Sequence, residues 1–262
     1  MVGKERHKAY ESALNTLGAI HNLDLNQGGN VFPSSSSNHR KSANLGQREP
    51  YLRRQLKRLL SVSLKQGTVA GGGIPGLHEV ADALEQNVQA APGGHTGSDI
   101  LIHGDFKVDN LIYHPTEPRV IAVLDWELSA IGDPLCDLAN LLMMYSIPAK
   151  SLNGGKNAFL VGLKGLDLKA HSLPSPTTLL TVYCKTYSPL FTTSEVLQWV
   201  PGFYLAFLFF KNAVIAHGVN QRAKDGVASS GRAREVGALV PLLVGLAGEA
   251  LKERPPPRRS KY

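Results

Sequence analysis

The sequence predicts an α+β fold that is mostly helical and carries one small β-hairpin. Three short apolar runs, at residues 100–102, 111–113 and 120–124, are bounded by turn-forming residues, which is typical of strands. Longer apolar segments fill much of the remaining chain, and their length favours helices. With 262 residues and 43% hydrophobic content, the chain can bury a sizeable core, and we expect one continuous lobe at residues 1–251.

The expected helices lie before and after these strands. The first two are separated by residues 27–43, a Ser-rich stretch that we expect to be a disordered insertion. His217 and Gly218 are expected to end the sixth helix, and Pro241 to break or kink the last one, because proline lacks a backbone donor. A basic, Pro-rich tail follows at residues 252–262. The helices are expected at residues 6–24, 51–65, 77–90, 135–145, 179–187, 193–216 and 231–252.

A loop between two of the expected strands, residues 103–110, reads His-Gly-Asp-Phe-Lys-Val-Asp-Asn. Gly104 allows a short loop to hold the Asp105 carboxylate out into a cleft. In phosphoryl transfer to an alcohol, such a carboxylate accepts the hydroxyl proton, and an amide five residues later can hold a metal bound to the nucleotide phosphates. Asp105 and Asn110 match these two roles. Lys107 is placed to neutralise charge on the transferring phosphoryl group.

A second acidic residue, Asp125, follows the expected strand at residues 120–124. Such a side chain suits Mg²⁺, which takes a few hard oxygen ligands from the protein and keeps waters and substrate phosphates for the rest. The turn at residues 114–118 is rich in breakers, so we expect a hairpin that brings Asn110 and Asp125 together. The sequence therefore predicts a phosphotransfer site with Asp105 as proton acceptor and the other two residues as metal ligands.

Structural roles compete with catalytic ones in this region. A single Asp after a Gly is most often a turn residue, and only the complete pattern of loop, strands and second Asp favours catalysis. Asp133 precedes Pro134 and is expected to cap the helix at residues 135–145. Asp137, one turn inside that helix, is expected to accept backbone N–H groups from the loop. His103 is expected to brace the loop rather than to carry a proton.

The segment at residues 101–142 resembles the aminoglycoside phosphotransferase and choline kinase-like family, and most closely the phosphotransferase domain found alone or fused to acyl-CoA dehydrogenases. Four other segments resemble helices of that family, at residues 6–24, 51–58, 207–222 and 227–232. The resemblance implies a protein-kinase-like C-lobe, ATP and Mg²⁺ as cofactors, and a small-molecule hydroxyl as acceptor. Among the family's acceptors, which include aminoglycosides, choline-like amines and sugars, it slightly favours hydroxy acids or hydroxyacyl thioesters.

The family's N-lobe has no counterpart in this sequence. In such kinases a Gly-rich loop covers the phosphates and a strand Lys pairs with a helix Glu, ahead of the segment matched here. The glycine run at residues 71–73 is followed by Pro75 and lacks a closing Lys-Ser/Thr, so we expect a flexible loop there. We therefore expect a C-lobe without its N-lobe. Two hypotheses follow: a truncated phosphotransferase whose activity on its own is in question, or a noncatalytic kinase-like binding or scaffold module.

Composition argues against several other classes. The net charge of +7 lies partly in the tail, and the chain lacks the interleaved aromatics, zinc spacings and RNP-like strands of nucleic-acid-binding proteins. Cys136 and Cys184 indicate neither a disulfide framework nor a zinc site. No secretory signal is visible, and the apolar run at residues 196–210 is short for a bilayer span. We expect an intracellular, cytoplasmic protein that binds a small molecule but neither nucleic acid nor membrane; the sequence leaves its oligomeric state open.

Overall fold

The computed structural model describes residues 3–24, 49–70, 73–94, 100–149, 160–187, 191–226 and 233–253. The expected insertion at residues 27–43, the glycines at 71–72 and residues 254–262 of the tail lie outside this part of the chain. The α-helices are α1 (Gly3–His21), α2 (Tyr51–Ala70), α3 (Leu77–Val88), α4 (Leu135–Ser146), α5 (Pro176–Thr186), α6 (Thr193–Trp199), α7 (Leu205–Lys224), α8 (Ala233–Gly237) and α9 (Val240–Lys252). The strands are β1 (Ile100–Ile102), β2 (Leu111–Tyr113), β3 (Val120–Val123) and β4 (Ala130–Gly132).

The strands form two antiparallel pairs among the described residues. The expected hairpin is confirmed as β2 and β3, with Leu111 opposite Val123. The second pair was not expected, because β4 has only a short apolar run; it joins β1 to β4, with Ile100 opposite Gly132. β1 precedes the loop at residues 103–110 and β4 follows the hairpin. Their pairing therefore brings together the two ends of the segment at residues 100–132. The mostly helical α+β fold expected from the sequence is confirmed.

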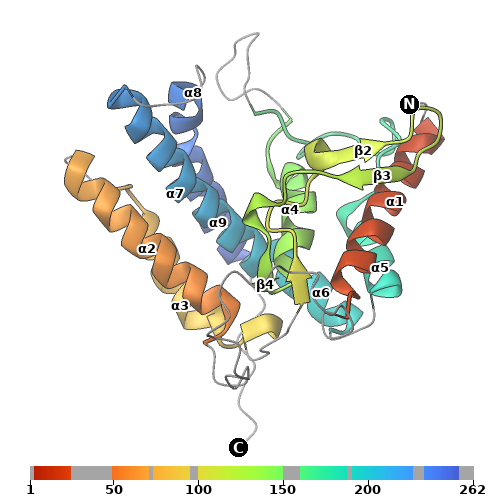
Figure 1. Cartoon of the computed structure of the whole chain (residues 1–262), viewed down its shortest axis with the longest axis horizontal. Coiled ribbons are helices and arrows are strands. Elements are labelled where there is room, and N and C mark those ends of the chain that lie inside the picture. Colours follow the sequence, from red (N-terminus) through yellow and green to blue (C-terminus); the bar gives the residue numbers. More distant parts are fainter. Residues whose placement is uncertain are drawn as a thin grey trace, which may run out of the picture.

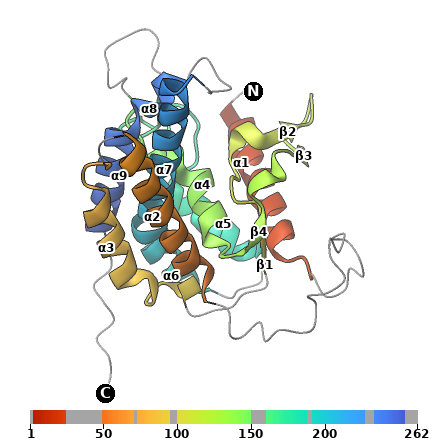
Figure 2. The ribbon, with the colours of Figure 1, turned by 60° about the vertical axis from the view of Figure 1, so that its left-hand side comes forward.

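The helices lie on both sides of this β-containing segment. Figure 1 shows α2, α3, α7 and α9 on one side, α1 and α5 on the other, and α4 between them. The turned view in Figure 2 keeps α2 beside α7 and the β2–β3 hairpin beside α1, in agreement with the contacts between these elements. Helix α7 contacts α2, α4, α8 and α9, which makes it the central helix of the lobe.

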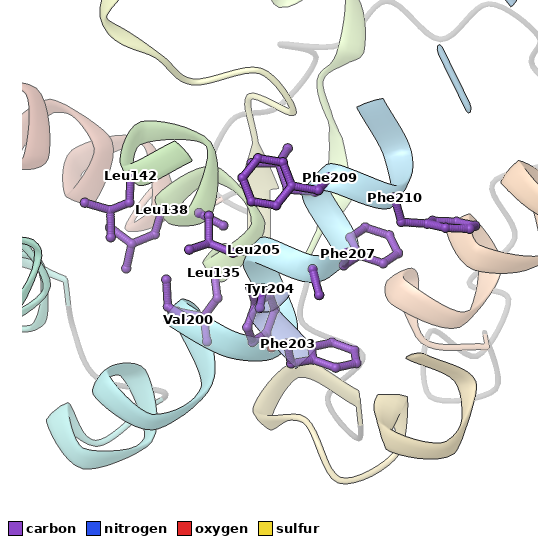
Figure 3. Close-up of a cluster of buried hydrophobic side chains, with 14 of the residues drawn as sticks. Leu135, Leu138, Leu142, Val200, Phe203, Tyr204, Leu205, Phe207, Phe209 and Phe210 are labelled. Carbon is purple, nitrogen blue, oxygen red and sulfur yellow. The ribbon is translucent and has the colours of Figure 1, made fainter. Parts of the chain in front are cut away.

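The core between α4 and α7 is built from large buried side chains. Leu135, Leu138 and Leu142 of α4 lie next to Val200 and Leu205, and the aromatic residues of α7 and of the π-helical turn Val200–Tyr204 continue the cluster (Figure 3). These aromatic residues are almost inaccessible to solvent; they are Phe203, Tyr204, Phe207, Phe209 and Phe210. Burying a Leu or Phe side chain stabilises a fold by about 1.5–3 kcal/mol, so this cluster holds α4 firmly against α7. These contacts fix the position of α4, whose Asp137 side chain contacts the loop at residues 103–110.

Two expectations about the helices near the C-terminus have different outcomes. Gly218 does not end the sixth helix, because α7 continues to Lys224. A Cβ atom at Gly218 would overlap the side-chain amide of Gln66, so this glycine permits close packing of α7 on α2 instead. The expected break at Pro241 is confirmed, since α8 ends at Gly237 and Pro241 lies in the first turn of α9.

A continuous helical stretch, Thr193–Lys224, is long and apolar enough to cross a membrane by length and composition alone. The expectation that this region is too short is therefore wrong, because the π-helical turn joins α6 to α7 without a break. In its most apolar window, 78% of the residues are buried inside the fold, as in the core helix of a globular protein. Length and composition are thus only weak evidence for a membrane span here.

Candidate active site

The loop at residues 103–110 brings Asp105, Lys107 and Asn110 into direct contact. The Lys107 ammonium donates to Asp105 Oδ2 at 2.7 Å. The Asn110 amide nitrogen donates to the Asp105 carbonyl at 2.9 Å and to Asp105 Oδ2 at 3.2 Å. Asn110 is buried, whereas Asp105 is partly exposed. The loop thus holds one partly exposed carboxylate against one positive charge, an ion pair that the sequence did not predict.

Asp125 lies just after β3 of the hairpin. The Leu124 amide donates to the Asn110 carbonyl at 2.8 Å, one residue beyond the paired strands, and Asp125 is the next residue in the chain. Asp125 has a left-handed backbone (φ 67°), which is uncommon outside glycine and is often found at functional sites. Its exposed carboxylate forms no hydrogen bond or ion pair with the residues that the structure describes. The hairpin therefore pairs the backbone of Asn110 with the residue before Asp125, while the Asn110 side chain contacts Asp105.

Asp137 of α4 accepts hydrogen bonds from the backbone of the loop, as expected. The amides of His103 and Gly104 donate to its two carboxylate oxygens at 2.6 and 2.7 Å. His21 Nε2 lies 3.2 Å from Asp137 Oδ2, and His21 Nδ1 lies 2.8 Å from the Tyr183 hydroxyl. All of these groups are buried. Two buried N–H groups without acceptors would cost desolvation free energy. Because the carboxylate accepts hydrogen bonds from both, it stabilises this conformation of the loop.

His103 joins the loop to the end of β3. Its Nδ1 accepts a hydrogen bond from the Asp105 amide at 3.2 Å, which places the ring proton on Nε2. That Nε2 then donates to the Leu124 carbonyl at 2.8 Å. Both ring nitrogens are therefore engaged with the backbone, and the ring is fully buried. This geometry agrees with the expected bracing role of His103.

Asp133 lies one residue before the N-cap residue Pro134, where it accepts the first amide of α4 and also contacts the core. Its Oδ1 accepts a hydrogen bond from the Leu135 amide at 3.0 Å, and its Oδ2 accepts one from the Tyr204 hydroxyl at 2.7 Å. The Gly93 amide donates in turn to the same hydroxyl at 3.1 Å. Burial raises the pKa of Asp133 to about 6, although both hydrogen bonds oppose this rise. The position of Asp133, away from the loop, fits the structural role predicted for it.

The groups around Asn110 and Asp125 fit a magnesium ion held jointly with a nucleotide. No cluster of three or more His, Cys, Asp or Glu side chains occurs within the described residues. Asn110 Oδ1 and the Asp125 carboxylate are hard oxygen atoms, and neither has a hydrogen-bond partner in the described part of the chain. Mg²⁺ is commonly held by one or two such ligands, with waters and phosphates completing its shell.

A groove that the sequence did not predict begins at the loop. It has a volume of about 430 Å³ and runs between α2, α7 and residues 127–130. Its walls include Tyr51, Arg58, Gly104, Glu127, Lys211 and Arg222. Lys211 donates to the Gly104 carbonyl at 2.9 Å, and Asn140 donates to the same oxygen at 3.2 Å.

Lys211 is the site residue that sequence reasoning missed. It lies inside the apolar run at residues 205–216, and a charged side chain in such a helix usually has a specific partner. That signal marks Lys211 as unusual, but it does not name Gly104, which is 107 residues away in the chain.

Comparison with known proteins agrees with this geometry. A model of the phosphotransferase enzyme family matches residues 2–164, which include the loop, the hairpin and α4. The chain belongs to the phosphotransferase enzyme family. A crystal structure of a Ralstonia eutropha protein assigned to the aminoglycoside phosphotransferases superposes with a TM-score of 0.75 at 28% identity, covering 98% of this chain and 68% of that one. The kinase-like fold expected from the sequence is thereby confirmed.

Longer relatives of this chain are named as acyl-CoA dehydrogenases. Acyl-CoA dehydrogenase family member 11 of Gallus gallus is 34% identical over 239 residues, which cover 91% of this chain and 27% of the relative. Probable acyl-CoA dehydrogenase IBR3 of Arabidopsis thaliana is 32% identical over 268 residues, covering 97% of this chain and 29% of the relative. The chain therefore spans between a quarter and a third of the length of these relatives, and the predicted similarity to a dehydrogenase-associated phosphotransferase domain is confirmed.

Proposed function

We propose that this chain carries the phosphotransfer site of an ATP- and Mg²⁺-dependent kinase that phosphorylates a hydroxyl group of a small molecule. The observation that supports this proposal most strongly is the contact between Asp105, Lys107 and Asn110, with the residue before Asp125 hydrogen-bonded to Asn110 in the hairpin. Membership of the phosphotransferase enzyme family supports the same reaction class. The kinase roles of these residues remain part of the proposal.

Each residue has a distinct task in this mechanism. When bound, Mg²⁺–ATP supplies the γ-phosphoryl group and a metal ion that offsets the charge on its oxygens. Asp105 accepts the proton of the acceptor hydroxyl as the hydroxyl oxygen attacks phosphorus and ADP leaves. Asn110 and Asp125 would hold the metal ion through their side-chain oxygens. Lys107, paired with Asp105, places a positive charge next to the reacting atoms, where charge develops.

Apolar side chains next to these groups suit a nucleotide base. Ile112 follows Asn110 by two residues and Leu124 precedes Asp125, and their side chains are 41% and 48% exposed. Exposed apolar groups beside a polar site are typical of binding surfaces for ligands with a flat, weakly polar part. We infer that the adenine contacts this side of the hairpin while the phosphates lie toward Asp125.

The groove supports an acceptor with negative charge. Arg58, Lys211 and Arg222 line it, opposed by the single acidic residue Glu127 among the described lining residues. Neither arginine has an ion-pair partner in the described part of the chain. Excess positive charge raises the local concentration of anionic ligands and repels polycations such as aminoglycosides. Together with the names of the dehydrogenase relatives, this charge favours hydroxy acids or hydroxyacyl thioesters as the acceptor class.

A second candidate is a noncatalytic kinase-like binding or scaffold module. One observation favours it: exposed apolar side chains gather on the loop, on the hairpin and just beyond it, a surface suited to a protein partner. They are Val108, Ile112, Ile121, Leu124 and Leu128. This module would contact its partner through the same face that the kinase hypothesis assigns to the nucleotide.

Calorimetric titration with ATP and Mg²⁺ distinguishes the two. If Asp125 is a metal ligand, Asp125→Asn weakens Mg²⁺–ATP binding by roughly tenfold or more, since loss even of groups that only support metal ligands costs roughly 10–100-fold. Asp109→Asn removes a carboxylate from the same loop, exposed and outside the proposed site, and is expected to leave the affinity unchanged. A folded wild-type protein that shows no heat of binding with Mg²⁺–ATP would exclude the kinase hypothesis and leave the binding module.

A further inference from the structure

Lys211 occupies an unusual place for a lysine. It lies in the apolar helix α7, is largely surrounded by protein, and is only partly accessible, on the side where it lines the groove. Burial lowers the pKa of its ammonium group, and the negative charges of Asp105 and Asp137 partly oppose that effect. Placing a charged group here costs folding free energy, so a specific use for the charge is expected.

The contacts of Lys211 within the lobe use only part of its capacity. An ammonium group has three N–H donors, and the Gly104 carbonyl is the acceptor recorded for it among the described residues. That carbonyl already receives the Asn140 amide at 3.2 Å. A neutral donor would therefore satisfy the backbone oxygen equally well. The positive charge and the remaining donors face the groove, where a ligand can meet them.

The two lysines near Asp105 differ in their surroundings. Lys107 belongs to the loop itself, pairs directly with the Asp105 carboxylate and lies outside the lining of the groove. Lys211 comes from α7, contacts the residue before Asp105 and lines the groove. Gly104, the residue before Asp105, lines the groove together with Lys211 and accepts its hydrogen bond. A molecule that extends from this end of the groove to Asp105 would therefore lie near the Lys211 ammonium.

We infer that Lys211 is a specificity-determining residue of the acceptor site, and that its ammonium binds a carboxylate oxygen located close to the hydroxyl that Asp105 deprotonates. The inference rests on the proposed phosphotransfer function and narrows its acceptor to a small hydroxy acid. It also assigns the preference for an anionic acceptor to Lys211, at the inner end of the groove, rather than to Arg58 and Arg222 further along α2 and α7.

The test compares two acceptor probes of similar size, 3-hydroxybutyrate and the neutral 1,3-butanediol, by saturation-transfer NMR titration without nucleotide. The variants are Lys211→Gln, which keeps a donor for the Gly104 carbonyl but removes the charge, and Lys211→Arg, which keeps the charge. Lys57→Gln is the matched control, because Lys57 is an exposed residue of α2 that does not line the groove.

We expect the wild-type protein to bind 3-hydroxybutyrate more tightly than the diol. Lys211→Gln is expected to bind the hydroxy acid roughly tenfold more weakly, as for the loss of one charge-assisted hydrogen bond, with diol binding unchanged. Lys211→Arg should retain the preference at least in part, and Lys57→Gln should match the wild type. In a kinase assay the same loss appears in KM for the hydroxy acid rather than in kcat.

Two results overturn the inference. One is a wild-type protein that does not prefer the carboxylate probe, a measurement that needs no variant to fold. The other is an equal loss of both probes in Lys211→Gln, which would show that Lys211 only shapes the loop. Mg²⁺–ATP affinity, measured separately on the same samples, reports on the phosphotransfer proposal. A preserved nucleotide affinity with no carboxylate preference therefore rejects the role of Lys211 alone.

Discussion

Replacement of Asp137 by asparagine is expected to destabilise the lobe and to make the loop at residues 103–110 more mobile. The carboxylate accepts the amides of His103 and Gly104 at 2.6 and 2.7 Å and contacts His21 at 3.2 Å. Asparagine has almost the same shape, so no cavity forms. Its single oxygen satisfies one backbone N–H group, while its NH₂ group opposes the other donor.

The magnitude follows from these contacts. One buried N–H group left without an acceptor costs about 1–3 kcal/mol, and the hydrogen bond that remains loses its charge-assisted strength. We expect Asp137→Asn to lower the free energy of unfolding by about 3 kcal/mol, a large part of the 5–15 kcal/mol typical of a whole domain. Because Asp105 directly follows Gly104, the loop should also become mobile at the proposed proton acceptor.

Urea unfolding and amide hydrogen exchange measure the two effects. Protection of the His103 and Gly104 amides should fall much more than that of amides in the middle of α7. Asp109→Asn, in the same loop but exposed, is the matched control and is expected to change stability by less than about 0.5 kcal/mol. The reasoning is refuted if Asp137→Asn is as stable as this control and both loop amides keep their protection.

Two further predictions concern stability. Burial raises the pKa of Asp133 from 3.8 to about 6, so its contribution to stability is present at low pH and is lost as pH rises through about 6. Asp133→Asn should therefore gain roughly 2–3 kcal/mol relative to wild type between about pH 4 and pH 7 in urea titrations. A difference that does not change with pH would contradict this. Gly104→Ala should destabilise the lobe more than Gly165→Ala: both glycines have positive φ (83° and 90°), which costs alanine roughly 1–2 kcal/mol, but only at Gly104 would a Cβ atom overlap the Leu128 carbonyl. Equal losses in the two variants, measured by urea unfolding, would contradict the overlap.

The parts of the site that lie close in sequence were predictable. The loop at residues 103–110 contains the contacting set Asp105, Lys107 and Asn110 within eight positions, so short-range geometry leaves few arrangements. A hairpin with a breaker-rich turn sets the strand register, and that register pairs Asn110 with Leu124, the residue before Asp125. The cap at Asp133 follows from local helix-end chemistry.

The predictions of secondary structure were wrong or incomplete where contacts between distant segments determine the local structure. Gly218 looked like a helix end by its local preference, but packing against Gln66 of α2 makes it an interior residue of α7. β4 was not predicted, because its pairing with β1, nearly thirty residues earlier, supplies what its own short apolar run does not. Tertiary contacts override weak local preferences in both cases.

The sequence by itself determined the family and the loop and hairpin residues of the proposed phosphotransfer site, because these residues lie close together in the chain. Only the tertiary structure decided what surrounds them: the groove between α2 and α7, and the Lys211 ammonium at its inner end. The physical reason is that the contact between Lys211 and Gly104 joins residues 107 positions apart, and burial in a shared core, not any local pattern, brings such residues together.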